Sequence, residues 1–286
     1  MDLDREPESR NVEDRRGRRV STGIAGGGIG TLIVILLALF FGFDPSVLLQ
    51  SNVREVNVPQ TQSPQSQQSS MNDEMRQFVA RVLGSTERTW DQIFQSAGRT
   101  YQKPTLVLFS DVVESACGFG QAAAGPFYCG EDQKVYIDLS FYRELRQRFH
   151  APGDFAQAYV IAHEVGHHVQ NLLGIMRKVQ SLQSRSSQLQ ANALSVRLEL
   201  QADCLAGIWA NHAHRERNIL EQGDIEEGLN AAAQIGDDRM QKRAQGYVVP
   251  EGFTHGSAQQ RVQWFRRGIS SGDLKQCDTF SRGPLS

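Results

Sequence analysis

Two histidines and a glutamate in the segment His-Glu-Val-Gly-His have the spacing best suited to chemistry. On an α-helix, His163 and His167 lie about one turn apart on the same face, where two imidazoles can bind one metal ion. Glu164 is displaced to the side, so its carboxylate can miss the metal and reach a water molecule held there. This HExxH pattern predicts Zn²⁺ as the cofactor, with Glu164 as the general base of a hydrolytic reaction.

Two carboxylates further along the chain can complete such a site. A catalytic zinc needs a third protein ligand and an open fourth position. Glu199 and Asp203 stand four residues apart in a segment that is otherwise apolar, so they share one face of a helix. Burying both without a partner would be costly. We therefore predict Glu199 as the third metal ligand and Asp203 as the acceptor of a ring N–H from one ligand histidine, which fixes that ring's tautomer and direction.

Other histidines have less certain partners. His255 precedes a predicted helix that contains Arg261. Zinc peptidases need a donor for the oxyanion that forms during the reaction, and His255 or a tyrosine could serve. Alternatively, Ser257 caps the helix and His255 is simply exposed. His168 follows the second ligand and points about a quarter-turn away from it, so we interpret it as a surface or supporting residue.

Two long helices are needed to position these residues. Apolar side chains recur at three- and four-residue steps over 155–172, with Asp154 as a predicted N-cap and Gly174 at the C-terminal end. A second long helix is expected over 188–214, and it carries both carboxylates. Further helices are expected over 72–94, 224–235 and 257–267.

Two short segments are rich in strand-forming residues. Residues 105–111 and 134–140 are each bounded by turn residues. Between them lies a glycine-rich loop with Cys117 at one end and Cys129 at the other, which suggests a hairpin or a small sheet. The predicted class is α+β, with helices dominant.

The four cysteines can form two disulfides if the domain lies outside the cytoplasm. Pairing Cys117 with Cys129 would close the glycine-rich loop and is the favoured choice. Cys204 and Cys277 then remain as the second pair. Four cysteines allow three pairings, and Cys204 alone could also be a small buried apolar residue.

The N-terminal part of the chain differs from the rest. Residues 24–43 contain no charged side chain, and such a run is long enough to cross a bilayer as a helix. No small-x-small cleavage site follows, which disfavours a signal peptide, and the run is apolar on every face, which disfavours a buried core helix. Basic residues gather before it, at Arg15, Arg16, Arg18 and Arg19. The positive-inside rule then predicts a single-pass protein of the cell (inner) membrane, with the N-terminus cytoplasmic and the catalytic domain extracytoplasmic.

This pattern divides the chain into four expected parts. Residues 1–23 form a cytoplasmic arm, residues 24–43 a transmembrane helix, and residues 44–70 a flexible linker rich in Gln, Ser and Pro. Residues 71–286 form the folded domain. The formal net charge of the chain is -2, with no basic face or nucleic-acid-binding signature, so no nucleic-acid partner is expected.

The chain resembles the bacterial neutral zinc metallopeptidases, short proteins with one N-terminal anchor and a gluzincin-like site. The resemblance covers nearly the whole chain and is carried by NVEDRRG (11–17), CGFGQAAAGPFYC (117–129), YIDLSFY (136–142), HEVGHHVQNLLG (163–174), ELQADCLAGIWA (199–210) and HGSAQQRVQWF (255–265). Gluzincins carry Glu-x-x-x-Asp after HExxH, and Glu199 and Asp203 match it.

The resemblance implies a zincin-like fold, in which the helix bearing the motif lies beneath a small sheet whose edge strand pairs with an extended peptide. Either 105–110 or 134–139 could be that edge. The expected function is a membrane-anchored zinc metalloendopeptidase acting on a peptide or protein substrate. Two alternatives remain: a zinc hydrolase of a non-peptide amide bond, and a non-catalytic, zinc-containing, membrane-tethered binding protein. The intact Glu164 disfavours the second alternative, since a structural zinc site does not need it.

Overall fold

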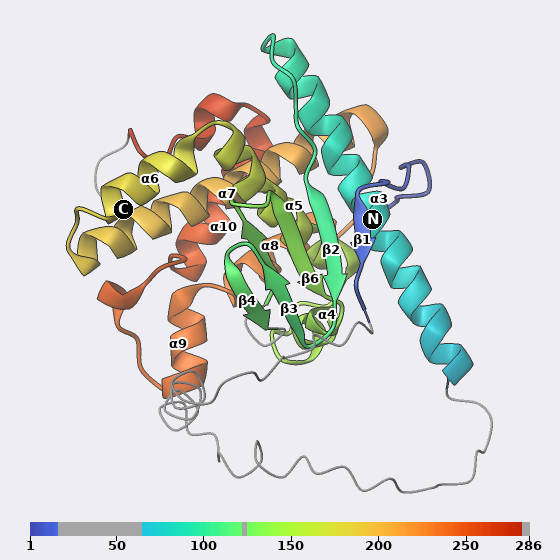
Figure 1. Cartoon of the computed structure of the whole chain (residues 1–286), viewed down its shortest axis with the longest axis horizontal. Helices are drawn as coiled ribbons and strands as arrows, with labels where there is room; N and C mark the ends of the chain where they lie inside the picture. Colours follow the sequence, from blue (N-terminus) through green and yellow to red (C-terminus); the bar gives the residue numbers. More distant parts are fainter. Residues whose placement is uncertain (17–64, 122–124, 282–286) are drawn as a thin grey trace, which may run out of the picture. The chain divides into compact units, whose positions relative to one another are not determined.

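The computed structural model describes residues 1–16, 65–121 and 125–281 (Figure 1). The strands are β1 (Val12–Asp14), β2 (Thr105–Phe109), β3 (Val112–Ser115), β4 (Gly118–Gln121), β5 (Phe127–Cys129) and β6 (Lys134–Asp138). The helices are α3 (Gln65–Ser96), α4 (Ser140–Gln147), α5 (Asp154–Leu172), α6 (Ile175–Gln183), α7 (Gln188–Arg217), α8 (Asp224–Gln234), α9 (Asp237–Gln245) and α10 (Ala258–Ser271), with 3₁₀ turns η2 (Pro250–Gly252) and η3 (Leu274–Cys277). The helix-dominated α+β class is as predicted.

Four strands form the main sheet, in the order β1-β2-β6-β5. The first three run parallel, and β5 runs antiparallel to β6. Strand β2 is buried over Leu106–Phe109, as expected for a continuous apolar strand inside a parallel sheet. Strands β3 and β4 form a separate antiparallel hairpin within the glycine-rich loop.

The prediction of the edge strand was wrong. Residues 105–110 and 134–139 correspond to β2 and β6, and both of these strands are interior. The outer positions belong to residues 12–14 and 127–129, which are three-residue strands too short to show an alternating pattern. Strand β5 is therefore the outermost strand on the side where the sheet packs against α5.

The five predicted helices are present as α3, α5, α7, α8 and α10 and differ only at their ends, whereas α4, α6 and α9 were not predicted. Helix α5 starts at Asp154, but its N-cap is Gly153, so Asp154 is the first helical residue rather than the cap. Gly174 adopts a left-handed conformation directly after the last turn, as predicted. Both favoured disulfides are confirmed, Cys117–Cys129 and Cys204–Cys277.

The N-terminal segment is part of the folded domain. Met1–Arg18 and Ser70–Ser286 form one compact unit, whereas the sequence suggested a separate arm over 1–23 and a domain starting at Met71. Met1 and Leu3 are buried in the main core, and β1 extends the sheet beside β2 (Figure 1). The charged residues of this segment hid its few apolar ones, so composition alone did not reveal the packing.

Helix α3 lies directly against this segment. Ser9 and Asn11 both donate side-chain hydrogen bonds to Glu87, each at 2.7 Å. The two backbones also approach closely, because a Cβ added at Gly84 would lie 2.1 Å from the carbonyl oxygen of Pro7. Only glycine fits at this point of contact.

Replacing Gly84 by alanine tests this packing. Helix propensity alone predicts that the change stabilises α3 by about 1 kcal/mol. The clash with Pro7 predicts the opposite, a loss of about 1–3 kcal/mol in the free energy of unfolding, as for other overpacked sites. Denaturant unfolding measures the sign, and trypsin cleavage after Arg10 reports release of the segment. Gly252→Ala is the control, since the nearest atom there lies at 3.6 Å.

The predicted transmembrane helix, residues 24–43, lies outside the described residues. Within the described ranges, no helix combines the length and apolar character needed to cross a membrane. The predicted linker, residues 44–70, also lies mostly outside them. Its last six residues, 65–70, are helical and belong to the start of α3.

Candidate metal centre

Helices α5 and α7 bring three predicted ligands together. Their ligand atoms all lie within 4.8 Å of one another. One carboxylate oxygen of Glu199 is 3.1 Å from Nε2 of His163, and the other is 3.3 Å from Nε2 of His167. Both imidazoles thus turn the same nitrogen toward the same carboxylate. Two nitrogens and one oxygen on three side chains form the donor set of a catalytic zinc site, so these residues fit the ion.

The glycine within the HExxH motif allows this approach. A Cβ added at Gly166 would lie 3.0 Å from the backbone oxygen of Ala202 and 3.2 Å from its Cα. A larger side chain would force α5 and α7 apart. Because α7 also carries Glu199, the small residue at position 166 helps bring the third ligand within reach of the two histidines.

The first ligand histidine is held in place by a buried charged network. Nδ1 of His163 lies 2.9 Å from Asp203, as predicted from the spacing on α7. Asp203 in turn accepts two hydrogen bonds of 2.9 Å from Arg261 and a very short one from the hydroxyl of Tyr159. All four side chains are buried. The network fixes Nδ1 as the protonated nitrogen and leaves Nε2 for the metal.

The second ligand histidine has a partner on its own helix. Nδ1 of His167 lies 2.9 Å from Oε1 of Gln170. The amide of Gln170 then donates to the backbone oxygen of Leu198 at 2.7 Å and to Gln201 at 3.1 Å, both on α7. Sequence analysis missed Gln170. Its position three residues after His167, on the same helix face, was the available signal.

Before a metal binds, the ligand histidines and Glu199 carry opposite charges. Burial alone would lower the pKa of His163, but Asp203 and Glu199 outweigh it and raise that pKa to about 10. Burial likewise raises the pKa of Glu199, and His167 and His163 overcome this and hold it well below its usual range. A metal ion must therefore displace a proton from the histidines, and its affinity should fall in acid.

Glu164 lies in the same buried region, with 7% of its surface exposed. Desolvation raises the pKa of its carboxyl, while His167 and His163 oppose that rise. A raised pKa makes a carboxylate a stronger base, so it takes a proton from water more readily. The setting suits the general base predicted from the motif.

His255 lies at the N-terminal side of α10 and has a carboxylate partner. Its Nδ1 is 3.1 Å from Asp237, which also accepts hydrogen bonds from the backbone amides of Thr254, His255 and Gly256 at 2.6–2.9 Å. Ser257 caps α10 in a capping box and the His255 side chain is 54% exposed, so both parts of the alternative interpretation are correct. Asp237 was not predicted, because nothing in its local sequence marks a residue eighteen positions before His255 as its partner.

The Asp237 hydrogen bond raises the pKa of His255 above its usual value of 6.5, against the opposing effect of desolvation, and Glu199 adds to the rise. The pair therefore stabilises the fold fully below pH 6.5 and loses this contribution as pH rises through the higher folded-state pKa. We expect the difference in unfolding free energy between the natural chain and His255→Gln to shrink from pH 6 to pH 9. Urea unfolding at several pH values measures it. A difference that grows with pH would contradict the assignment.

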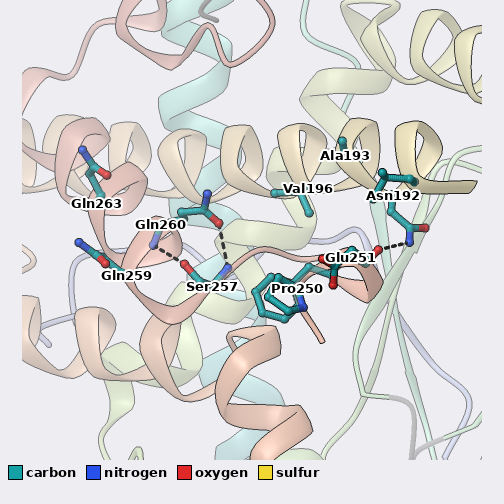
Figure 2. Close-up of a pocket in the computed structure, with 11 residues that line it drawn as sticks. Asn192, Ala193, Val196, Pro250, Glu251, Ser257, Gln259, Gln260 and Gln263 are labelled. Atoms are coloured by element: carbon teal, nitrogen blue, oxygen red, sulfur yellow. Dashed lines mark hydrogen bonds between the residues drawn. The ribbon is translucent and has the colours of Figure 1, made fainter. Parts of the chain in front are cut away.

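A pocket of about 380 Å³ lies against the first half of α7 (Figure 2). Val196 lines it and stands one helical turn before Glu199. Asn192 donates to the backbone oxygen of Glu251 at 2.9 Å, which ties α7 to η2. The capping box of Ser257 and Gln260 forms another wall. The pocket thus lies between the first half of α7, η2 and the start of α10, and none of the three metal ligands lines it.

A second group of acidic residues, Asp154, Asp224 and Glu227, also has ligand atoms close together. The amino group of Met1 lies 2.7 Å from Asp154 and 3.4 Å from Asp224. This ammonium gives two of the three carboxylates a cationic partner, so packing of the N-terminal segment accounts for their proximity.

The family model described as "Putative neutral zinc metallopeptidase" matches residues 1–280. The chain belongs to this family. Its relatives include the Escherichia coli K12 protein YpfJ, 50% identical over 284 residues, with 96% of this chain and 97% of that protein covered. The Mycobacterium tuberculosis H37Rv protein Rv2575 is 37% identical over 258 residues, with 87% of this chain and 86% of that protein covered. No solved structure matches the chain.

Membership in the neutral zinc metallopeptidase family agrees with the donor set formed by His163, His167 and Glu199. The match also begins at residue 1, so it includes the N-terminal segment that packs beside β2. The family match thus covers both the segment and the metal centre.

Proposed function

We propose that this chain is a zinc metalloendopeptidase that hydrolyses peptide bonds. The observation that carries the proposal is the meeting of His163, His167 and Glu199 around one point, with Glu164 buried beside them. A structural zinc site needs only ligands, whereas this one adds a carboxylate suited to proton transfer. The family description supports the same chemistry.

Bound zinc would supply Lewis-acid polarisation of water and of the peptide carbonyl. Glu164 takes the proton from the attacking water and later passes it to the leaving amine. Asp203 and Gln170 keep the ring N–H groups of the two histidines occupied, so the other nitrogens stay directed at the centre. When His255 is protonated, its Nδ1 can donate to Asp237 and its Nε2 carries an N–H that could donate to the developing oxyanion.

The substrate would bind as an extended peptide along β5. This strand is the outermost of the described sheet on the side of α5, and backbone pairing there would add a strand next to the metal centre. A peptide running along α7 would also pass the pocket at Val196, whose apolar lining includes Ala193 and Phe253. Backbone pairing would tolerate many sequences, and the pocket would favour some side chains over others.

Zinc content and cleavage of an unfolded protein, measured on the purified full chain in detergent, test the proposal. We expect about one zinc per chain, loss of cleavage after chelation and recovery when zinc is restored. Glu199→Gln should lose zinc while remaining folded, because it removes a charged ligand. Glu226→Gln, on the exposed face of α8, is the matched control and should change neither quantity. A zinc-loaded chain that cleaves no peptide would contradict a peptidase.

A further inference from the structure

Two segments far apart in the sequence, Met1–Arg18 and Ser70–Ser286, fold into one compact unit. Residues 19–69 join these two segments in the sequence. Residues 24–43 lie within that stretch and carry no charged side chain. Because the segments before and after residues 24–43 pack together, the positions of the two segments relative to a membrane are not independent.

The N-terminal segment is held by backbone hydrogen bonds at several points. Asn11 accepts from the amide of Leu106, and the amide of Arg15 donates to Leu108, each at 2.8 Å. The amide of Asp2 donates to Ile219, just beyond α7, also at 2.8 Å. The segment thus pairs with the central sheet at one end and reaches the last turn of the ligand-bearing helix at the other.

A buried ion pair links the segment to α7. Oε1 of Glu6 lies 2.6 Å from Nε of Arg217, and the two side chains are 0% and 7% exposed. Arg217 also donates to Thr89 of α3 at 2.9 Å. Withdrawing the segment would remove the buried carboxylate partner of Arg217 and leave it only the more exposed Glu216, at 2.9 Å, which is unfavourable.

A single crossing of the bilayer by residues 24–43 would separate these partners. The hydrocarbon core is about 30 Å thick, so Glu6 and Arg217 could not then be in contact. We infer that Met1–Arg16 and the metal-centre domain lie on the same side of the membrane. This replaces the single-pass arrangement expected from the positive-inside rule, and it does not depend on the peptidase chemistry.

The cysteines favour one of the two sides. All four are paired, in Cys117–Cys129 and Cys204–Cys277, and disulfides persist in oxidising compartments. The arginines before residue 24 favour the cytoplasmic side instead. In a single-pass protein these two signals would be compatible. If both segments lie on the same side, the disulfides and the arginines predict different sides. We follow the disulfides, which place both segments on the extracytoplasmic side.

Labelling of the full chain in its membrane tests the inference. Single cysteines are introduced at the exposed positions Glu8 and Gln222, as Glu8→Cys and Gln222→Cys, and treated with a membrane-impermeant maleimide before and after permeabilisation. The parent chain is the control, because its cysteines are all paired. We expect both positions to react at the same stage. Reaction at opposite stages would overturn the inference.

Cross-linking shows whether the segment is docked in the membrane-bound chain. Asp4 and Arg81 are partners across the contact, with side-chain atoms 3.4 Å apart. In Asp4→Cys/Arg81→Cys, a short bismaleimide should join the two residues within one chain, as seen by mass spectrometry of the linked peptides. The two single variants are the controls. Same-side labelling without this cross-link would also overturn the inference, since the packing on which it stands would be absent.

Discussion

Replacing Glu164 with glutamine is expected to lower peptide cleavage by at least about 100-fold while the chain keeps its zinc. Loss of a positioned general base typically lowers the reaction rate by a factor of this size or more. Glutamine has nearly the same shape but cannot take a proton from water. Glu164 does not belong to the ligand set formed by His163, His167 and Glu199, so metal content should not change. Zinc analysis and the cleavage rate, measured on the same preparation, separate the two effects.

Stability provides a further test of the same substitution. Burial penalises the charged form of Glu164 and raises the pKa of its carboxyl. A neutral amide at this position should leave the free energy of unfolding unchanged or slightly higher, as is common for residues placed for function rather than for stability. Glu226→Gln again serves as the control. If Glu164→Gln cleaves at the natural rate, or loses its zinc, the role assigned to Glu164 is wrong.

Replacing Asp203 with asparagine is expected to destabilise the fold by about 3–5 kcal/mol and to weaken zinc binding by about 10–100-fold. Both effects have one cause. The substitution leaves the buried guanidinium of Arg261 without its carboxylate and removes the anion that holds His163. Denaturant unfolding and zinc titration with a competing chelator measure them. Asp91→Asn, which removes a partly exposed partner of Lys103, should cost no more than about 1 kcal/mol.

A double variant shows how much of the lost stability comes from leaving one charge of the Asp203–Arg261 pair without its partner. In Asp203→Asn/Arg261→Met no unpaired charge remains in the network, so the loss of stability should be smaller than the sum of the two single losses. Zinc affinity should remain low, because His163 still lacks its anionic partner. Additive losses would show that Asp203 and Arg261 act independently, contrary to their two hydrogen bonds.

Helical periodicity explains which site residues could be predicted from the sequence. The HExxH spacing places His163 and His167 on one face, and the same rule places Glu199 above Asp203. These are local relations within a single helix. Gln170 obeys the same rule but was missed, because an amide carries no charge that would make its burial conspicuous.

Contacts between segments far apart in the chain could not be predicted from the sequence. Arg261 was only a residue of a predicted helix, and nothing local indicated its burial against Asp203. Asp237 likewise reaches His255 through a turn of the chain that periodicity does not describe. The sheet was misjudged for the same reason, since the strands outside β2 and β6 have three residues each. Pairing across long separations depends on the whole fold rather than on local pattern.

The packing of the N-terminal segment also sets an order for folding during synthesis. Glu6 leaves the ribosome early, but its partner Arg217 is 211 residues further along the chain. At about 5–20 residues per second, the segment waits for at least about ten seconds before the contact can form. Contacts this distant in sequence close a large loop, so they slow folding. Nascent chains that stop before α7 contain β2, the partner of β1, but lack Arg217, so they should remain incompletely folded and open to proteases.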